Sequence, residues 1–161
     1  MALQAVDYDA VYEIGRILAE TPREGPARVV EYLRDRFSHY DWVGIYWVEG
    51  RDLVLGPWKG PEATEHTRIP IGRGVCGAAA ASGRTEIVPD VRADARYLAC
   101  FASTQSEIVV PIRAGGRVIG EIDIDAKALN AFGPADQQFL EAVAALLATL
   151  WPAVPIRSAP A

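Results

Sequence analysis

Cysteine, histidine and methionine are all scarce in this chain, which has two cysteines, two histidines and one methionine among 161 residues. His39 and His66 are separated and have no cysteine or aspartate at the spacing of a zinc motif, so no metal site is expected. No nucleophile elbow or Ser-His-Asp pattern is present either. In a reducing compartment, two cysteines are more often buried small residues or reactive thiols than a structural disulfide.

The chain also lacks basic clusters and long apolar runs. Its 21 acidic residues outnumber its 16 Lys and Arg residues, giving a net charge of −5. Because phosphate binding needs concentrated positive charge, no nucleic-acid partner is expected. No apolar run approaches the length of a membrane span, and residues 1–7 do not resemble a signal peptide. The expectation is therefore a cytoplasmic protein with no membrane association.

The order of apolar patterns predicts an α+β fold. Helical periodicity predicts helices at residues 8–20 and 27–38, a short Ala-rich helix at 75–81 and a last helix starting at Gly133-Pro134. Alternation and turn signals predict strands at 41–48, 52–58, 68–71, 85–88, 107–113 and 117–125. We expect a single domain at 1–151, with an antiparallel sheet and flanking helices on one face. Residues 152–161 contain three prolines and predict a flexible tail.

The two cysteines lie in different local settings. Cys76 follows a Gly-x-Gly turn at the predicted start of a helix, where backbone N–H groups favour the thiolate and lower a thiol pKa. A small core residue in an Ala-rich helix is an equally good interpretation. Cys100 lies in the irregular segment 89–104, and a lone loop cysteine is more often incidental than catalytic. A second thiol matters because it converts a sulfenic acid to a disulfide.

Acidic residues alternate with isoleucine on one predicted strand. This spacing places Glu121, Asp123 and Asp125 on one face, and Glu107 begins the neighbouring strand of the hairpin. A solvated strand face is the common explanation for such alternation. The alternative is a shared pocket that suits an ammonium group, in which a raised carboxyl pKa suits proton donation.

Aromatic residues share one face of the first predicted strand. Trp42, Gly44 and Tyr46 alternate there, so an aromatic wall with a glycine gap could cradle a methyl or thioether group. Core packing is the favoured interpretation of this pattern when it is considered alone.

Five strings together carry a family resemblance. They are Asp-Trp-Val-Gly-Ile-Tyr at 41–46, Leu-Val-Leu-Gly-Pro-Trp at 53–58, Gly-Val-Cys-Gly at 74–77, Ser-Glu-Ile-Val-Val-Pro at 106–111 and Ile-Asp-Ile-Asp at 122–125. In this order they resemble the GAF-domain free methionine-(R)-sulfoxide reductases. The resemblance implies a GAF-like fold, a six-stranded antiparallel sheet with the ligand in a closed pocket, and reduction of free methionine-(R)-sulfoxide without a metal or organic cofactor.

The resemblance also implies roles for particular residues. Cys100 matches the nucleophile. The residues that match the substrate-binding positions are Glu107, Asp123, Asp125, Trp42 and Tyr46. Cys76 matches the family's Gly-Val-Cys-Gly cysteine and is expected to resolve the sulfenic acid as a disulfide, with thioredoxin as reductant in a response to oxidative stress.

Three positions differ from the family pattern. The usual resolving cysteine before Arg-Ile-Pro is absent at residues 65–67, Phe101 replaces an aspartate and Tyr97 replaces a histidine. Resolution by Cys76, resolution by an external thiol and loss of turnover all remain open. The alternative function is a non-catalytic GAF module that binds a small molecule or forms a homodimer.

Overall fold

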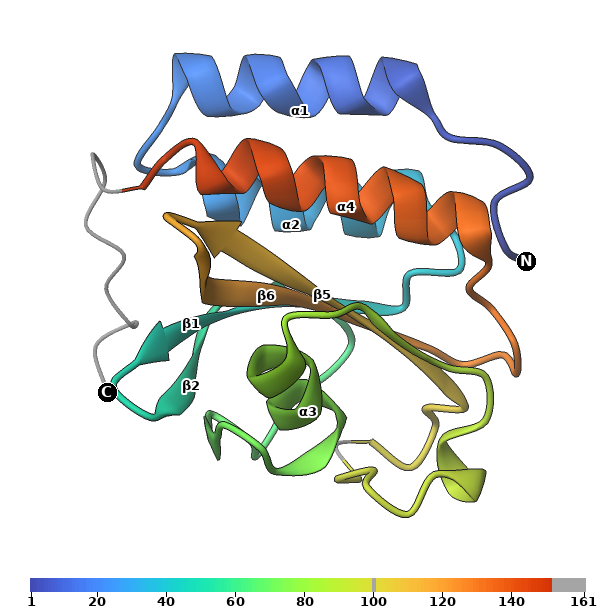
Figure 1. Cartoon of the computed structure of the whole chain (residues 1–161). Coiled ribbons are helices and arrows are strands. Elements are labelled where there is room, and N and C mark those ends of the chain that lie inside the picture. Colours follow the sequence, from blue (N-terminus) through green and yellow to red (C-terminus); the bar gives the residue numbers. More distant parts are fainter. Residues whose placement is uncertain (100, 152–161) are drawn as a thin grey trace.

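The computed structural model describes residues 1–99 and 101–151 (Figure 1). The elements, in chain order, are α1 (Tyr8–Glu20), α2 (Gly25–Arg36), β1 (Trp42–Glu49), β2 (Asp52–Lys59), β3 (Arg68–Pro70), α3 (Gly74–Ser82), β4 (Glu86–Val88), a 3₁₀ turn (Val91–Ala93), β5 (Ser106–Ala114), β6 (Arg117–Ala126) and α4 (Pro134–Ala148). The predicted helices and strands are all confirmed, with ends that shift by at most two residues. The predictions for Cys100 and for the tail 152–161 lie outside the described residues.

The six strands form one antiparallel sheet with the order β3-β2-β1-β6-β5-β4. The β5–β6 hairpin is closed by Gly115 and Gly116, since Ala114 pairs with Arg117. Both glycines have positive φ, 59° and 77°, which is the conformation a two-residue hairpin turn requires. An irregularity between Ile112 and Arg113 then shifts the register by one residue, so that Glu107 lies opposite Asp125.

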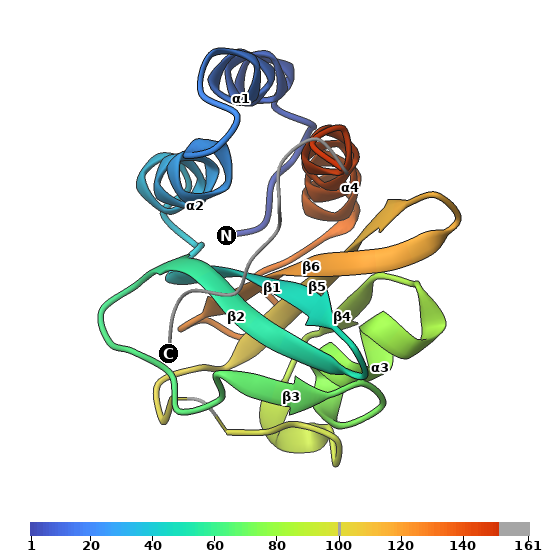
Figure 2. The ribbon, with the colours of Figure 1, turned by 90° about the vertical axis from the view of Figure 1, so that its left-hand side faces the viewer.

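The helices cover both faces of the sheet, not one face as the sequence predicts. Figures 1 and 2 show α1, α2 and α4 on one face and α3 on the opposite face. The buried residues of α3 share a core with Trp42, Tyr46 and Val109 on that opposite face. The helix also packs its backbone closely against the turn before it. A Cβ atom placed on Gly77 would lie 2.8 Å from the Pro70 carbonyl oxygen, so only a glycine permits this approach.

The two faces have separate apolar cores. Along β1, Val43, Ile45 and Trp47 pack beneath α1, α2 and α4, whereas Trp42 and Tyr46 belong to the smaller core under α3. Strand geometry explains this division because successive side chains point to opposite faces. Full burial of a side chain such as Ile45 contributes about 1.5–3 kcal/mol.

A buried carboxylate connects the chain start to the last helix. Asp136 in α4 accepts hydrogen bonds from the backbone N–H groups of Leu3 and Gly133 and from the Tyr40 hydroxyl, and it contacts His39 Nε2 at 2.7 Å. These hydrogen bonds hold the pKa of Asp136 below its ordinary value, although its burial acts in the opposite direction. Over the residues that the structure describes, no helix is both long and apolar enough to cross a membrane.

Candidate functional site

Four acidic side chains gather on the α3 face of the sheet. Glu107 comes from β5, and Glu121, Asp123 and Asp125 alternate along β6. The antiparallel register sets Glu107 opposite Asp125 and Asp123 opposite Val109. All four are buried, with exposures between 0% and 4%. The interpretation as a solvated strand face is therefore wrong. The pocket shared by the acids stays a prediction, and Glu107 and Asp123 line a small cavity.

Burial makes the charged forms of these acids costly. Loss of hydration raises the pKa of Asp123, Asp125 and Glu121, and the neighbouring Asp123 carboxylate raises the pKa values of the other two further. Both carboxyl oxygens of Glu121 and one oxygen each of Asp123 and Asp125 have no hydrogen-bond partner among the described residues. The arrangement favours neutral carboxylic acids until a cation enters.

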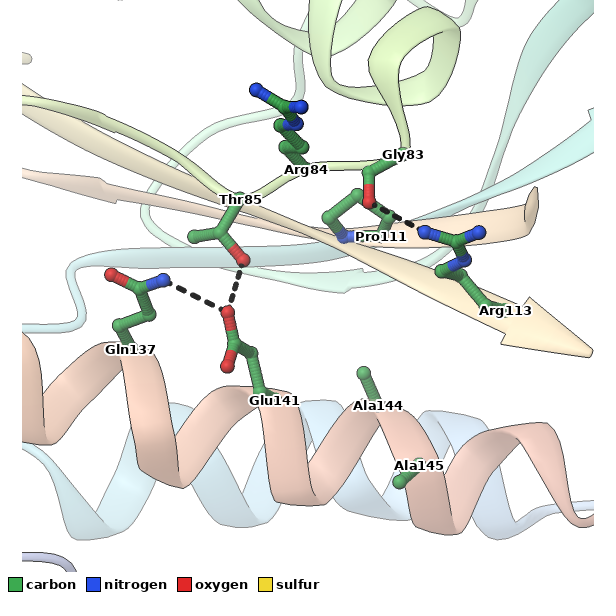
Figure 3. Close-up of a pocket in the computed structure, with 9 residues that line it drawn as sticks. All are labelled: Gly83, Arg84, Thr85, Pro111, Arg113, Gln137, Glu141, Ala144 and Ala145. Atoms are coloured by element: carbon green, nitrogen blue, oxygen red, sulfur yellow. Dashed lines mark hydrogen bonds between the residues drawn. The ribbon is translucent and has the colours of Figure 1, made fainter. Parts of the chain in front are cut away.

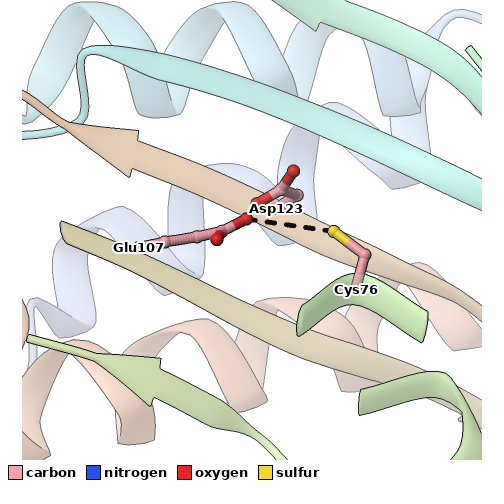
Figure 4. Close-up of side chains that lie close together, drawn as sticks. All are labelled: Cys76, Glu107 and Asp123. Atoms are coloured by element: carbon pink, nitrogen blue, oxygen red, sulfur yellow. Dashed lines mark hydrogen bonds between the residues drawn. The ribbon is translucent and has the colours of Figure 1, made fainter. Parts of the chain in front are cut away.

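Cys76 faces the acids from α3. Its Sγ lies 3.9 Å from Oε1 of Glu107 and donates a weak hydrogen bond to it (Figure 4). Burial raises the pKa of the Cys76 thiol well above its ordinary value, and the carboxylates of Asp123, Glu121 and Glu107 raise that pKa further. The expected lowering of this pKa by the helix N-terminus is therefore wrong, because desolvation and nearby negative charge outweigh the partial charge of the helix end. The interpretation of Cys76 as a small core residue fits the burial of its side chain, but carboxyl groups lie beside its thiol.

The predicted aromatic wall is present, but its glycine gap is filled. Trp42 and Tyr46 are both buried on the site face, and the Tyr46 hydroxyl donates to the His66 carbonyl at 2.7 Å. A Cβ atom on Gly44 would lie 2.4 Å from the Trp42 ring, so this ring itself occupies the space above the glycine. An open cradle at Gly44 is therefore not found, because the indole folds back along its own strand.

Two aromatic neighbours of Trp42 were not among the predicted site residues. Trp58 stacks against the Trp42 ring at 6.1 Å, and Phe101 packs against it at 5.7 Å. Side-chain alternation on the second strand of the hairpin does not predict that Trp58 stacks on Trp42, because the stack depends on the orientation of the Trp42 ring. Phe101 follows Cys100, whose own position lies outside the described residues. The structure thus leaves the predicted pairing of Cys76 and Cys100 as a prediction.

Among the described residues, a small cavity borders the site. A space of about 10 Å³ is lined by Ile69, Val75, Cys76, Leu98, Glu107 and Asp123. This volume is close to the lower limit for one water molecule. Leu98 was also absent from the predicted site, and it lies against the start of α3, because a Cβ atom on Gly74 would approach its side chain to 2.8 Å. The volume of this cavity is too small for an amino acid.

A larger pocket lies elsewhere, between α4 and the end of α3. It has a volume of about 570 Å³ and includes Arg113, Glu141, Thr85 and Gln137 (Figure 3). Glu141 accepts hydrogen bonds from Thr85 and Gln137, and Arg113 donates to the Gly83 carbonyl. None of the predicted site residues lines it. The volume of a pocket therefore does not identify the candidate site. The buried thiol and carboxyl groups identify it.

The fold and the site define the class of protein. The family model described as GAF domain matches residues 27–151, so the chain belongs to the GAF domain family. The match includes all seven residues predicted for the site. The first helix, α1, precedes the matched segment but packs against α2 and α4.

Comparisons with individual proteins narrow this class to the free methionine-R-sulfoxide reductase family. The Escherichia coli free methionine-R-sulfoxide reductase is 39% identical over 71% of this chain and 68% of its own length. The Neisseria meningitidis enzyme, solved in complex with its substrate, is 35% identical, with a TM-score of 0.82 and coverage of 93% of this chain and 94% of that chain. The match to Protein YtsP of Bacillus subtilis, at 46% identity, spans 62% of this chain and 61% of that protein's length.

Proposed function

We propose that this chain reduces free methionine-(R)-sulfoxide to methionine. The observation that carries the proposal is the cluster of buried carboxyl groups around the Cys76 thiol, on a fold shared with reductases of that substrate. Buried carboxyl groups suit the ammonium group of a free amino acid, and one oxygen each of Asp123 and Asp125 has no hydrogen-bond partner among the described residues. The entering ammonium group lets one or more carboxyl groups ionise, and a carboxyl that stays neutral can hydrogen-bond the sulfoxide oxygen.

In the proposed first step, the Cys100 sulfur attacks the sulfoxide sulfur. The sulfur–oxygen bond of the substrate breaks, and the oxygen passes to Cys100 as a sulfenic acid together with the thiol proton. Methionine leaves as the thioether. A neutral acid among Glu107, Asp123 and Asp125 assists by placing a proton on the oxygen as the bond breaks. The buried indole of Trp42 and ring of Tyr46 would contact the substrate's methyl end.

In the proposed second step, the Cys76 sulfur attacks the Cys100 sulfenic acid. A disulfide forms, and the hydroxyl group leaves as water with the Cys76 proton. A dithiol such as thioredoxin then reduces the disulfide and restores both thiols. A reducing cytoplasm suits this cycle because it keeps the free thiols available. The high pKa of Cys76 predicts that the second step accelerates as pH rises above neutral, because the thiolate is the attacking form.

The test is an assay with free methionine-(R)-sulfoxide, driven in parallel by dithiothreitol and by thioredoxin, with the (S) epimer as control. Cys100→Ser should abolish reduction. Cys76→Ser should retain dithiothreitol-driven turnover and lose thioredoxin-driven turnover, and mass spectrometry should find a Cys76–Cys100 disulfide in the unmodified protein. Full activity of Cys100→Ser would show that the mechanism is wrong.

A protein that binds the sulfoxide without consuming it would be a non-catalytic GAF module. Two observations favour this second candidate: residues 65–67 lack the family's usual resolving cysteine, and Phe101, which packs against Trp42, stands where the family has an aspartate. Calorimetric titration with methionine-(R)-sulfoxide separates loss of binding from loss of chemistry. Size-exclusion chromatography with light scattering tests whether the module forms a homodimer.

A further inference from the structure

Three side chains that commonly ligate metals converge at the candidate site. Cys76 comes from α3, Glu107 from β5 and Asp123 from β6, and all three are buried. The sulfur and one oxygen from each carboxyl group all lie within 4.8 Å of one another (Figure 4). A zinc ion binds sulfur at about 2.3 Å and carboxylate oxygen at about 2.0–2.2 Å, so ligands of one ion lie at most about 4.5 Å apart. Small side-chain rotations would bring the three atoms to this spacing.

A second observation indicates a ligand at the same place. The cavity of about 10 Å³ is bordered by these three residues, and its other walls are the apolar side chains of Ile69, Val75 and Leu98. Oδ1 of Asp123 is buried and has no hydrogen-bond partner among the described residues. The cavity therefore has space for a ligand no larger than one water molecule and a polar atom without a partner. Its apolar walls strengthen electrostatic attraction to such a ligand.

The local charge also favours a cation. In the part of the chain that the structure describes, no ion pair includes Asp123 or Glu121. Three groups that can each become negative surround the cavity, so a doubly charged cation would allow them to ionise. The thiol already points at a carboxylate oxygen, 3.9 Å away, along a line that a bridging ion could occupy after a small shift.

We propose that Cys76, Glu107 and Asp123 bind a thiophilic divalent cation, Zn²⁺ or Cd²⁺. One thiolate and two carboxylates are a mixed donor set of the kind that zinc accepts, whereas Mg²⁺ and Ca²⁺ prefer oxygen alone. Binding replaces the thiol proton and any carboxyl protons with the metal and releases those protons to the buffer. No electron transfer is involved. Within the proposed function, such a cation would occupy the carboxylates meant for the substrate's ammonium group and would inhibit reversibly.

The experiment is a titration of the fully reduced protein with Cd²⁺ in chelator-free buffer, without substrate. The ultraviolet charge-transfer absorption of a cadmium–thiolate bond should rise and saturate at one cation per chain. Zn²⁺ should displace Cd²⁺, and a large excess of Mg²⁺ should not. Because no turnover is measured, this result is independent of whether the chain reduces methionine sulfoxide.

Three variants locate the cation. Cys76→Ser and Asp123→Asn should each weaken Cd²⁺ binding by more than about 100-fold, since loss of a direct ligand exceeds the 10–100-fold cost of losing an outer-shell partner. Glu31→Gln, which removes an exposed carboxylate, should bind as the unmodified chain does. Cys76→Ser keeps Cys100, so a charge-transfer band of unchanged strength in this variant would assign the cation to the other thiol and overturn the proposal.

Two further results would also overturn it: unchanged affinity in Asp123→Asn, or no saturable binding by the unmodified protein. Melting temperatures of all variants are measured first. If Cys76→Ser does not fold, Cys76→Ala and Asp123→Asn supply the same comparison. Wild-type affinity in either of these variants would again exclude the site.

Discussion

Asp123→Asn is expected to stabilise the protein while it weakens substrate binding. Asp123 is buried, its pKa is raised, and its charge raises the pKa values of Asp125, Glu121 and Cys76. Above its raised pKa a charged Asp123 costs stability, and a neutral asparagine of similar shape removes a cost of about 1.4 kcal/mol for each unit by which the pKa is raised. A gain of about 1 kcal/mol corresponds to a rise in melting temperature of about 2–4 °C for a chain of this size.

The sign of the pH dependence follows from the same shift. A carboxyl group whose folded pKa is raised contributes stability that is fully present below its unfolded pKa of about 3.9. That contribution is lost as pH rises through the folded pKa, because the unfolded chain ionises more easily. The unmodified protein should therefore lose stability between acidic and neutral pH, and Asp123→Asn should lose less.

Substrate binding should change in the opposite direction. A hydrogen bond to a charged group contributes about 1.5–3 kcal/mol, so losing the carboxylate should raise the Kd for methionine-(R)-sulfoxide by about 10–150-fold. Scanning fluorimetry at pH 5 and pH 8, combined with calorimetric titration, measures both effects. Asp35→Asn is the control, since Asp35 is exposed and its ion pair with Lys59 contributes little. A variant that is less stable at pH 8 and binds substrate normally would refute the reasoning.

Two further predictions concern stability alone. Asp136→Ala should destabilise the protein by about 3 kcal/mol or more in urea unfolding, because it leaves several buried donors unsatisfied. Since the folded pKa of Asp136 is lowered, the difference in stability from the unmodified protein should shrink as pH falls below about 4. A difference that stays constant with pH would contradict this origin. Gly77→Val should cost about 1–3 kcal/mol, because its Cβ meets backbone atoms of the Pro70–Gly72 turn. Gly15→Ala, where nothing lies within 4 Å, should instead stabilise α1 by about 0.5–1 kcal/mol, and equal effects of the two changes would count against the packing argument.

Much of the site could be predicted because strand alternation is a short-range rule. Asp123 and Asp125 share a face by sequence parity alone. The position of Glu107 beside them depends also on a register shift between Ile112 and Arg113, which alternation does not predict. Glu121 follows from the same parity, although the sequence assigned it no role. Whether that face was buried could not be derived locally, since burial depends on α3, which comes from a distant part of the chain.

The remaining features depend on three-dimensional contacts. The Ala-rich composition of α3 predicts a helix, but the side of the sheet that it covers depends on the core that its buried residues share with β1, β2 and β5. Burial raises the pKa of Cys76 most, and acids from two strands raise it further, against the helix end that the local sequence suggests. The Trp42 ring could not be placed over Gly44 because side-chain rotation is decided by its neighbours Trp58 and Phe101.

Both edges of the sheet are very short. The outer strands β3 and β4 contain only three residues each, and β3 ends at Pro70, which has no N–H group to donate. Long exposed edges are the places where sheets of separate molecules join and where aggregation starts. Each of these two outer strands offers too few backbone groups to add another strand. Concentrated protein is therefore expected to resist growth of intermolecular β-structure for as long as the native sheet stays intact.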